Sequence, residues 1–129
     1  GEDTLSLHDA LPIFPITDRI LVMPLIGTMD GDRAQQALDA LLQDASSRAA
    51  EFVILDITGL KRVDESVASM LLHAASGLRL LGTRAVLTGI RSEVARAFVK
   101  LNASLQGIVT KATLQDGIAV AMQAARRRA

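Results

Sequence analysis

A serine with two acidic neighbours, Asp64-Glu65-Ser66, stands where the sequence predicts the beginning of a helix. The first N–H groups of a helix lack partners and carry partial positive charge, so this position favours anions. A phosphate on Ser66 would be supported by that field and would add about two negative charges to the surface. These residues make Ser66 a candidate regulatory switch. The alternative interpretation is an ordinary solvated serine in the first helical turn.

Three further residues, Asp56, Thr88 and Lys111, follow the pattern of a phosphoaspartate signalling domain, the two-component receiver. Receivers phosphorylate an aspartate at a strand end, helped by a threonine and a lysine that follow later strands. They also need an acidic pair after the first strand to hold Mg²⁺. The corresponding strand here ends in Leu25-Ile-Gly-Thr28, and Asp30 comes a little late. A receiver-like domain is therefore the alternative hypothesis.

The residues that a small enzyme would need do not form a recognisable pattern. Gly27 and Gly31 lack the Lys-Ser/Thr context of a phosphate-binding loop. A Ser–His–Asp set cannot be assembled, because His73 is the only histidine within a predicted element. Two histidines and no cysteine are too few for most zinc sites. We expect no catalytic residue, no metal and no cofactor. A small nucleotide-binding α/β module stays open as a further alternative.

Composition and charge exclude several classes of partner. Fourteen basic and fourteen acidic residues give a net charge of zero, which argues against nucleic acid, since phosphate backbones are bound by basic faces. With three Phe, no Trp and no Tyr, stacking on bases is almost excluded. No apolar run reaches the roughly 18 residues of a membrane span, and no signal peptide is evident. We expect a cytoplasmic protein that binds neither nucleic acid nor membrane.

The elements that must position Ser66 alternate between strands and helices. Short apolar runs predict strands, and runs with helical spacing behind a capping residue predict helices. The expected strands cover residues 14–16, 19–26, 51–57, 84–88 and 107–110, and the expected helices begin at Asp30, Asp64, Ser92 and Thr113. Such alternation predicts an α/β domain with a largely parallel sheet. Pro24 within its strand predicts a sheet edge or a bulge.

Several motifs that occur in the same order resemble one family. They are Gly27-Thr-Met-Asp30, Val63-Asp64-Glu65-Ser66, the run LLGTRAVLTGIRSEV from Leu80 to Val94, and the run IVTKATLQDG from Ile108 to Gly117. From residue 15 to about residue 123, the chain resembles a STAS domain of anti-sigma-factor antagonists and stressosome scaffold proteins. The resemblance implies a four- or five-stranded mixed, mostly parallel sheet with about four helices packed mainly on one face.

The resemblance also implies a regulatory domain that has no catalytic activity of its own. Its partners would be an anti-sigma-type serine/threonine kinase and other STAS proteins, in homo- or hetero-oligomers. The kinase would phosphorylate the loop at the start of the second major helix. The expected switch residues are Asp64, Glu65 and Ser66, and the expected partner-binding residues are Asp30, Thr58, Lys61, Arg62, Ser69 and His73.

The sequence departs from the stressosome pattern at the switch itself. In that subfamily the residue after the loop aspartate is a phosphoacceptor Ser or Thr, and here it is Glu65. A glutamate is charged and accepts no phosphate, so it could imitate a permanently modified state, while Ser66 stands one position later. The second acceptor Thr of the scaffold proteins falls near Ala97, which has no hydroxyl group. We predict that phosphorylation control is weakened or lost.

The two ends of the chain are expected to lie outside the domain. Residues 4–13 (TLSLHDALPI) match one reading frame of a common sequencing adapter, and Phe14 continues that frame. We therefore expect residues 1–13 to be a non-native leader, with a natural linker as the alternative. Residues 14–124 are expected to form the STAS domain, and residues 125–129 a basic tail.

Overall fold

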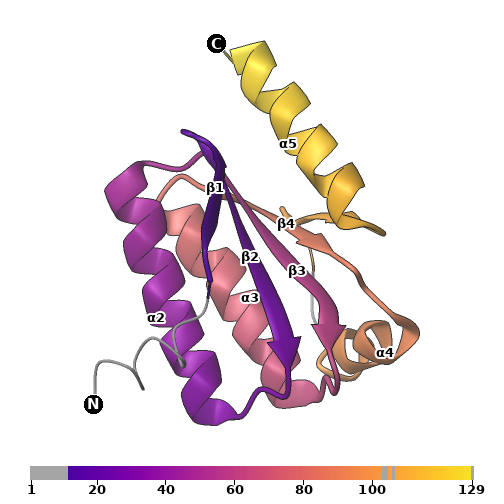
Figure 1. Ribbon diagram of the computed structural model, residues 1–129. Helices are drawn as coiled ribbons and strands as arrows, with labels where there is room; N and C mark the ends of the chain where they lie inside the picture. Colours follow the sequence, from indigo (N-terminus) through magenta and orange to yellow (C-terminus); the bar gives the residue numbers. More distant parts are fainter. Residues whose placement is uncertain (1–11, 103–104, 106, 129) are drawn as a thin grey trace.

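The computed structural model describes residues 12–102, 105 and 107–128 (Figure 1). The strands are β1 (Phe14–Thr17), β2 (Ile20–Gly27), β3 (Phe52–Leu60), β4 (Arg84–Thr88) and β5 (Val109–Lys111). The helices are α2 (Gly31–Arg48), α3 (Glu65–Leu80), α4 (Ser92–Lys100) and α5 (Leu114–Arg128). Strands and helices alternate after β1, as the sequence predicts. The predicted leader lies outside the described residues as far as residue 11, and it stays a prediction.

The sheet is mixed and mostly parallel, in the order β1-β2-β3-β4-β5. β1 pairs antiparallel with β2, whereas β3 pairs in parallel with β2 and β4, and β5 pairs in parallel with β4. Parallel pairs need crossover connections, which α2, α3 and α4 supply. The carboxyl ends of β2, β3 and β4 therefore meet at one edge of the sheet, where the loops into these three helices begin.

Side chains along β2, β3 and β4 alternate between two cores of unequal size. In β3, Leu55 and Ile57 face the large core under α2, α3 and α4, whereas Phe52 and Ile54 face a smaller core under α5. Figure 1 shows α2 and α3 side by side on one face of the sheet, with α5 apart from them. The prediction that the helices pack mainly on one face is confirmed.

β3 is longer than the sequence predicts, which changes the setting of one candidate residue. Thr58-Gly59 indicates a strand end, but β3 continues to Leu60, which pairs with Gly27 at the end of β2. Ladder pairing with a neighbouring strand outweighs the local turn preference of this dipeptide. Thr58 therefore lies inside the strand and not after it, whereas Asp56 lies inside it as predicted.

The structure decides between the two alternatives at Pro24 and corrects the helix cap predicted at Ser92. Pro24 lies in β2, which has a strand on each side, so it marks no sheet edge. The register with β3 shifts between Pro24 and Ile26, which is a bulge. Ser92 is the first residue of α4 and not its cap, since Arg91 holds the cap position without a side-chain cap bond. The predicted tail is helical up to Arg128.

None of the helices in the described part of the chain has the length and hydropathy that a membrane-spanning helix requires.

Candidate functional site

The predicted switch residues lie at the carboxyl edge of the sheet, where β3 leads into α3. Asp64 caps α3, because its Oδ1 atom accepts hydrogen bonds from the Val67 N–H at 3.0 Å and from the Ser66 hydroxyl at 2.8 Å. Hydrogen bonding holds the pKa of Asp64 below its usual value. The largest cause is the bond from the Val67 N–H, and the second is the bond from the Ser66 hydroxyl. Ser66 is exposed, and its hydroxyl proton is directed at Asp64. The lone pairs of Oγ thus stay free to attack a phosphoryl group.

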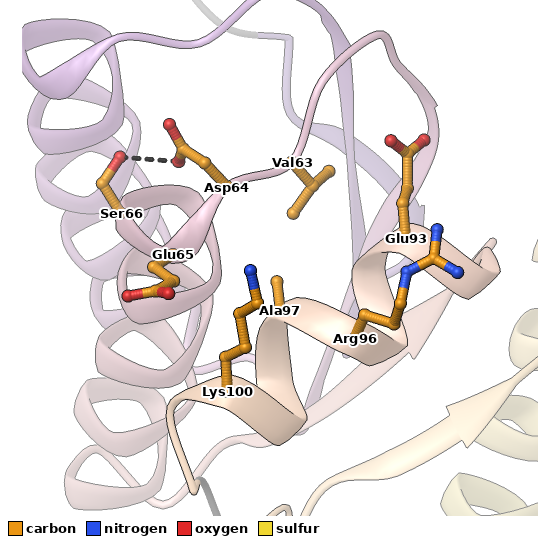
Figure 2. A pocket seen from close by; sticks show the side chains of 8 residues that line it. All are labelled: Val63, Asp64, Glu65, Ser66, Glu93, Arg96, Ala97 and Lys100. Atoms are coloured by element: carbon orange, nitrogen blue, oxygen red, sulfur yellow. Dashed lines mark hydrogen bonds between the residues drawn. The ribbon is translucent and has the colours of Figure 1, made fainter.

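A hollow of about 480 Å³ opens between the start of α3 and helix α4 (Figure 2). The residues that line it are Val63, Asp64, Glu65, Ser66, Glu93, Arg96, Ala97 and Lys100. In Figure 2 the Lys100 ammonium group points from α4 toward the wall that carries Asp64 and Glu65. Ala97, where the resemblance places a second phosphoacceptor, lines the same hollow as Glu65 and Ser66. The candidate acceptor Ser66 and the position that corresponds to the family's second acceptor therefore line one depression.

Ser66 also borders a smaller groove of about 180 Å³ between α2 and α3. Ser69 and His73 line this groove, because residues spaced three and four positions apart form one stripe along a helix. Gly31 and Gln35 line the groove from α2. The structure thus joins two of the predicted partner-binding residues, Ser69 and His73, to the predicted switch residue Ser66.

Three more of the predicted partner-binding residues are exposed around the same edge of the sheet. Asp30 caps α2, where its Oδ1 atom accepts a hydrogen bond from an N–H group of the first turn at 2.8 Å. Lys61 and Arg62 lie on the loop before Asp64 with exposed side chains. The backbone N–H of Lys61 donates to the oxygen of Gly27 at 2.9 Å, which ties this loop to the end of β2. All three side chains are exposed, and their role in binding a partner stays a prediction.

The receiver-like residues are aligned in the sheet, and two of them, Asp56 and Thr88, form a structural contact. Asp56 pairs in register with Thr88, and Thr88 with Lys111. Asp56 is buried, and its carboxylate accepts hydrogen bonds from the Thr88 hydroxyl at 2.6 Å and the Thr58 hydroxyl at 3.0 Å. Within the described residues, no group of three His, Cys, Asp or Glu side chains could hold a metal ion. The receiver hypothesis gains no support, and the predicted partner residue Thr58 has its hydroxyl bonded inside the sheet.

Arg91 is a residue that sequence reasoning missed. Its guanidinium group donates hydrogen bonds to the backbone oxygens of Thr58, at 3.4 Å, and of Leu60, and it forms a salt bridge with Glu93 at 3.1 Å. Because Leu60 ends β3, this contact holds the base of the switch loop against the start of α4. The only signal in the sequence is an arginine beside a predicted helix start, which indicates no particular partner.

Replacing Asp64 with alanine should lower the free energy of unfolding by about 1 kcal/mol, because the first turn of α3 loses its cap. Urea denaturation at pH 7 measures this loss, and Asp64→Asn is the control that keeps a capping side chain. The pKa of Asp64 is lower in the folded state than in the unfolded state. The cap's contribution is therefore fully present above about pH 4 and is lost as the pH falls through the folded-state pKa. Equal stability of Asp64→Ala and the unaltered chain at pH 7 would contradict the assigned cap.

The fold and the site define a class of protein. The sequence model of the STAS domain matches residues 12–117, and the chain belongs to the STAS domain family. A variant of Moorella thermoacetica RsbS with one serine replaced by glutamate matches the structure with a TM-score of 0.80 at 31% identity, over 90% of this chain and 97% of that chain. A chain from the structure entitled "Molecular architecture of the stressosome, a signal integration and transduction hub" matches with a TM-score of 0.72 at 28% identity, over 89% and 99%. The predicted family and fold class are confirmed.

The curated relatives are regulatory proteins. RsbT co-antagonist protein RsbRA of Bacillus subtilis (strain 168) is 38% identical over 133 aligned positions, which cover 98% of this chain and 48% of that protein. RsbT co-antagonist protein RsbRD of the same organism is 35% identical over 108 positions, which cover 84% and 39%. The chain thus spans about half, or less, of the length of these relatives. Their names describe them as co-antagonists of RsbT.

Proposed function

We propose that this chain is a non-catalytic STAS domain that regulates through protein–protein contacts in the cytoplasm. Its partners are a serine/threonine kinase and sibling STAS domains, in homo- or hetero-oligomers. The observation that carries the proposal is Ser66, an exposed hydroxyl group at a helix start that borders two depressions. The relatives named as co-antagonists of RsbT, and the stressosome chain with the same fold, support this choice of partners.

A phosphate on Ser66 would change the charge of this surface at its centre. Lys61 and Arg62 lie on the loop before it, and Asp64 and Glu65 lie beside it. The partially positive start of α3 favours an anion there, whereas the carboxylates of Asp64 and Glu65 repel it. A partner that fits the unmodified surface meets about two added negative charges. Because charge complementarity governs specificity and association rate, this change is sufficient to release a partner.

Glu65 weakens this control in our proposal. Its carboxylate lines the same hollow as Ser66, so the surface is already negative before any phosphate is added. The relative difference in surface charge between the unmodified and the modified state is therefore smaller than with a serine or threonine at position 65. Ala97, on the opposite wall of the hollow, has no hydroxyl group that could add a second phosphate. The domain then acts mainly as a binding surface.

Incubation with an anti-sigma-type serine/threonine kinase and ATP, followed by mass spectrometry, tests the proposal. We expect phosphate on Ser66 at well below one group per chain, and none in the loop of Ser66→Ala. Glu65→Ser should raise the incorporated phosphate several-fold, because it restores an acceptor directly after Asp64. Stoichiometric phosphate on the unaltered loop would show that control is intact. Failure of the kinase to bind the unmodified chain, measured by calorimetry, would contradict the kinase partner.

A further inference from the structure

A second hollow lies at the opposite end of α3 from Ser66. Its volume is about 450 Å³, and residues from the end of α3, the start of β4 and the start of β5 line it. Arg79, which lines this hollow, follows Ser66 in the same helix. At a rise of 1.5 Å per residue, the two residues lie about 20 Å apart along the helix. The hollow is therefore separate from the switch surface. Its volume falls in the range of small-molecule sites in proteins.

Positive charge without a counter-charge distinguishes this hollow. Arg79 and Arg84 line it, and no acidic residue is among the described residues that do so. Within the described part of the chain, neither guanidinium group forms a salt bridge. The backbone oxygen of Glu51 accepts the Arg84 N–H, but the Glu51 carboxylate is bridged to Arg19 at 3.5 Å. In a chain with zero net charge, the arginine pair is a local concentration of positive charge.

A glycine makes room for one of these arginines. Gly107 has a φ of 86°, in the left-handed region, and a Cβ atom there would lie 3.1 Å from Nη1 of Arg79. The guanidinium group therefore rests against bare backbone. The apolar side chains of Ala75, Ala85 and Ile108 line the hollow beside it. A charged end and an apolar lining are thus combined in one depression.

We propose that this hollow binds a phosphoryl anion through Arg79 and Arg84, and that the apolar lining contacts an organic group attached to the phosphate. Guanidinium groups present rigid donor forks that match phosphate oxygens, and charge-assisted bonds of this kind are strong. The volume of the hollow, about 450 Å³, is many times the roughly 30 Å³ that one water molecule takes up in the liquid. The hollow therefore also has room for an organic phosphate. The site does not depend on the function proposed for Ser66.

A titration of the ¹⁵N-labelled chain with inorganic phosphate and, separately, with adenosine monophosphate tests this site. The ionic strength is held constant with sodium chloride, and the amide signals of Gly107 and Ile108 should shift to saturation. Arg79→Ala and Arg84→Ala should each weaken binding about tenfold, because each removes one donor fork. Arg79→Lys keeps the charge but loses the fork, so its affinity should be intermediate. Arg33→Ala, in the first turn of α2, should bind as the unaltered chain does.

Tighter binding of the nucleotide than of inorganic phosphate would support the contact between the apolar lining and an organic group. Equal binding would overturn that contact and leave a site for free phosphate. Shifts that stay linear with concentration would overturn it, and so would unchanged affinity in Arg79→Ala and Arg84→Ala. Circular dichroism checks that the variants fold. Arg79→Lys and Arg84→Ala decide the question if Arg79→Ala does not fold.

Discussion

Replacing Gly89 with alanine is expected to lower the free energy of unfolding by about 3 kcal/mol, from backbone strain and overpacking together. Gly89 follows β4 with a φ of 79°, where an alanine is strained. An added Cβ atom would also overlap Oγ1 of Thr58 and lie 2.7 Å from the backbone nitrogen of Thr58. The hydroxyl group can rotate away, but the backbone of β3 can move only by disturbing its pairing with β2 and β4.

Gly82→Ala is the matched control for this variant. Gly82 has a φ of 82°, close to that of Gly89, but an added Cβ atom would meet nothing within 4 Å. Its substitution should cost only the backbone strain, about 1 kcal/mol. Urea denaturation of both variants separates strain from overlap. Equal losses would contradict a close approach of the segment after β4 to β3.

Replacing Thr88 with valine should lower the free energy of unfolding by about 2 kcal/mol, because a buried carboxylate loses a hydrogen-bond donor. Thr88 is fully buried, and its hydroxyl donates to Oδ1 of Asp56 at 2.6 Å. Valine keeps the shape of threonine, so the loss reports the hydrogen bond and not a cavity. In Thr88→Val, the hydroxyl group of Thr58, at 3.0 Å, is the one described side-chain donor that Asp56 keeps.

Thr110→Val serves as the control for this second variant. Thr110 lies in β5, the strand that pairs with β4, but it is exposed. The same chemical change should alter stability there by no more than about 0.5 kcal/mol, as is usual for surface substitutions. Thermal and urea denaturation measure both variants. A Thr88→Val protein as stable as Thr110→Val would mean that the contact with Asp56 does not stabilise the sheet.

Much of the fold could be predicted from the sequence, because its signals are local. Apolar runs that end at glycines indicate the strands, and acidic caps indicate the starts of α2 and α3. Asp30 and Asp64 do accept hydrogen bonds from the first turns of these helices. The place of Ser66 in the first turn of α3 follows from the same cap, so this part of the candidate site could be predicted as well.

The lateral contacts of the site could not be predicted, since they depend on which elements become neighbours. Arg91 reaches the backbone of Leu60 across 31 positions of sequence, and nothing in its own segment indicates that contact. The hollow that joins Ser66 to Ala97 requires α4 to pack beside the start of α3. β3 extends past Gly59 only because β2 offers it a partner for one more pair.

The core between α5 and the sheet is much smaller than the core on the opposite face of the sheet. The core on the α5 side of the sheet has six buried residues: Ile20, Val22, Phe52, Ile54, Val86 and Ala121. Segments with few buried apolar contacts open at a free energy below that of global unfolding. We therefore expect α5 to open at a lower free energy than the part of the domain that carries Ser66. Brief detachment of α5 would expose the side chains of Asp56 and Thr88 to water while the start of α3 stays in place.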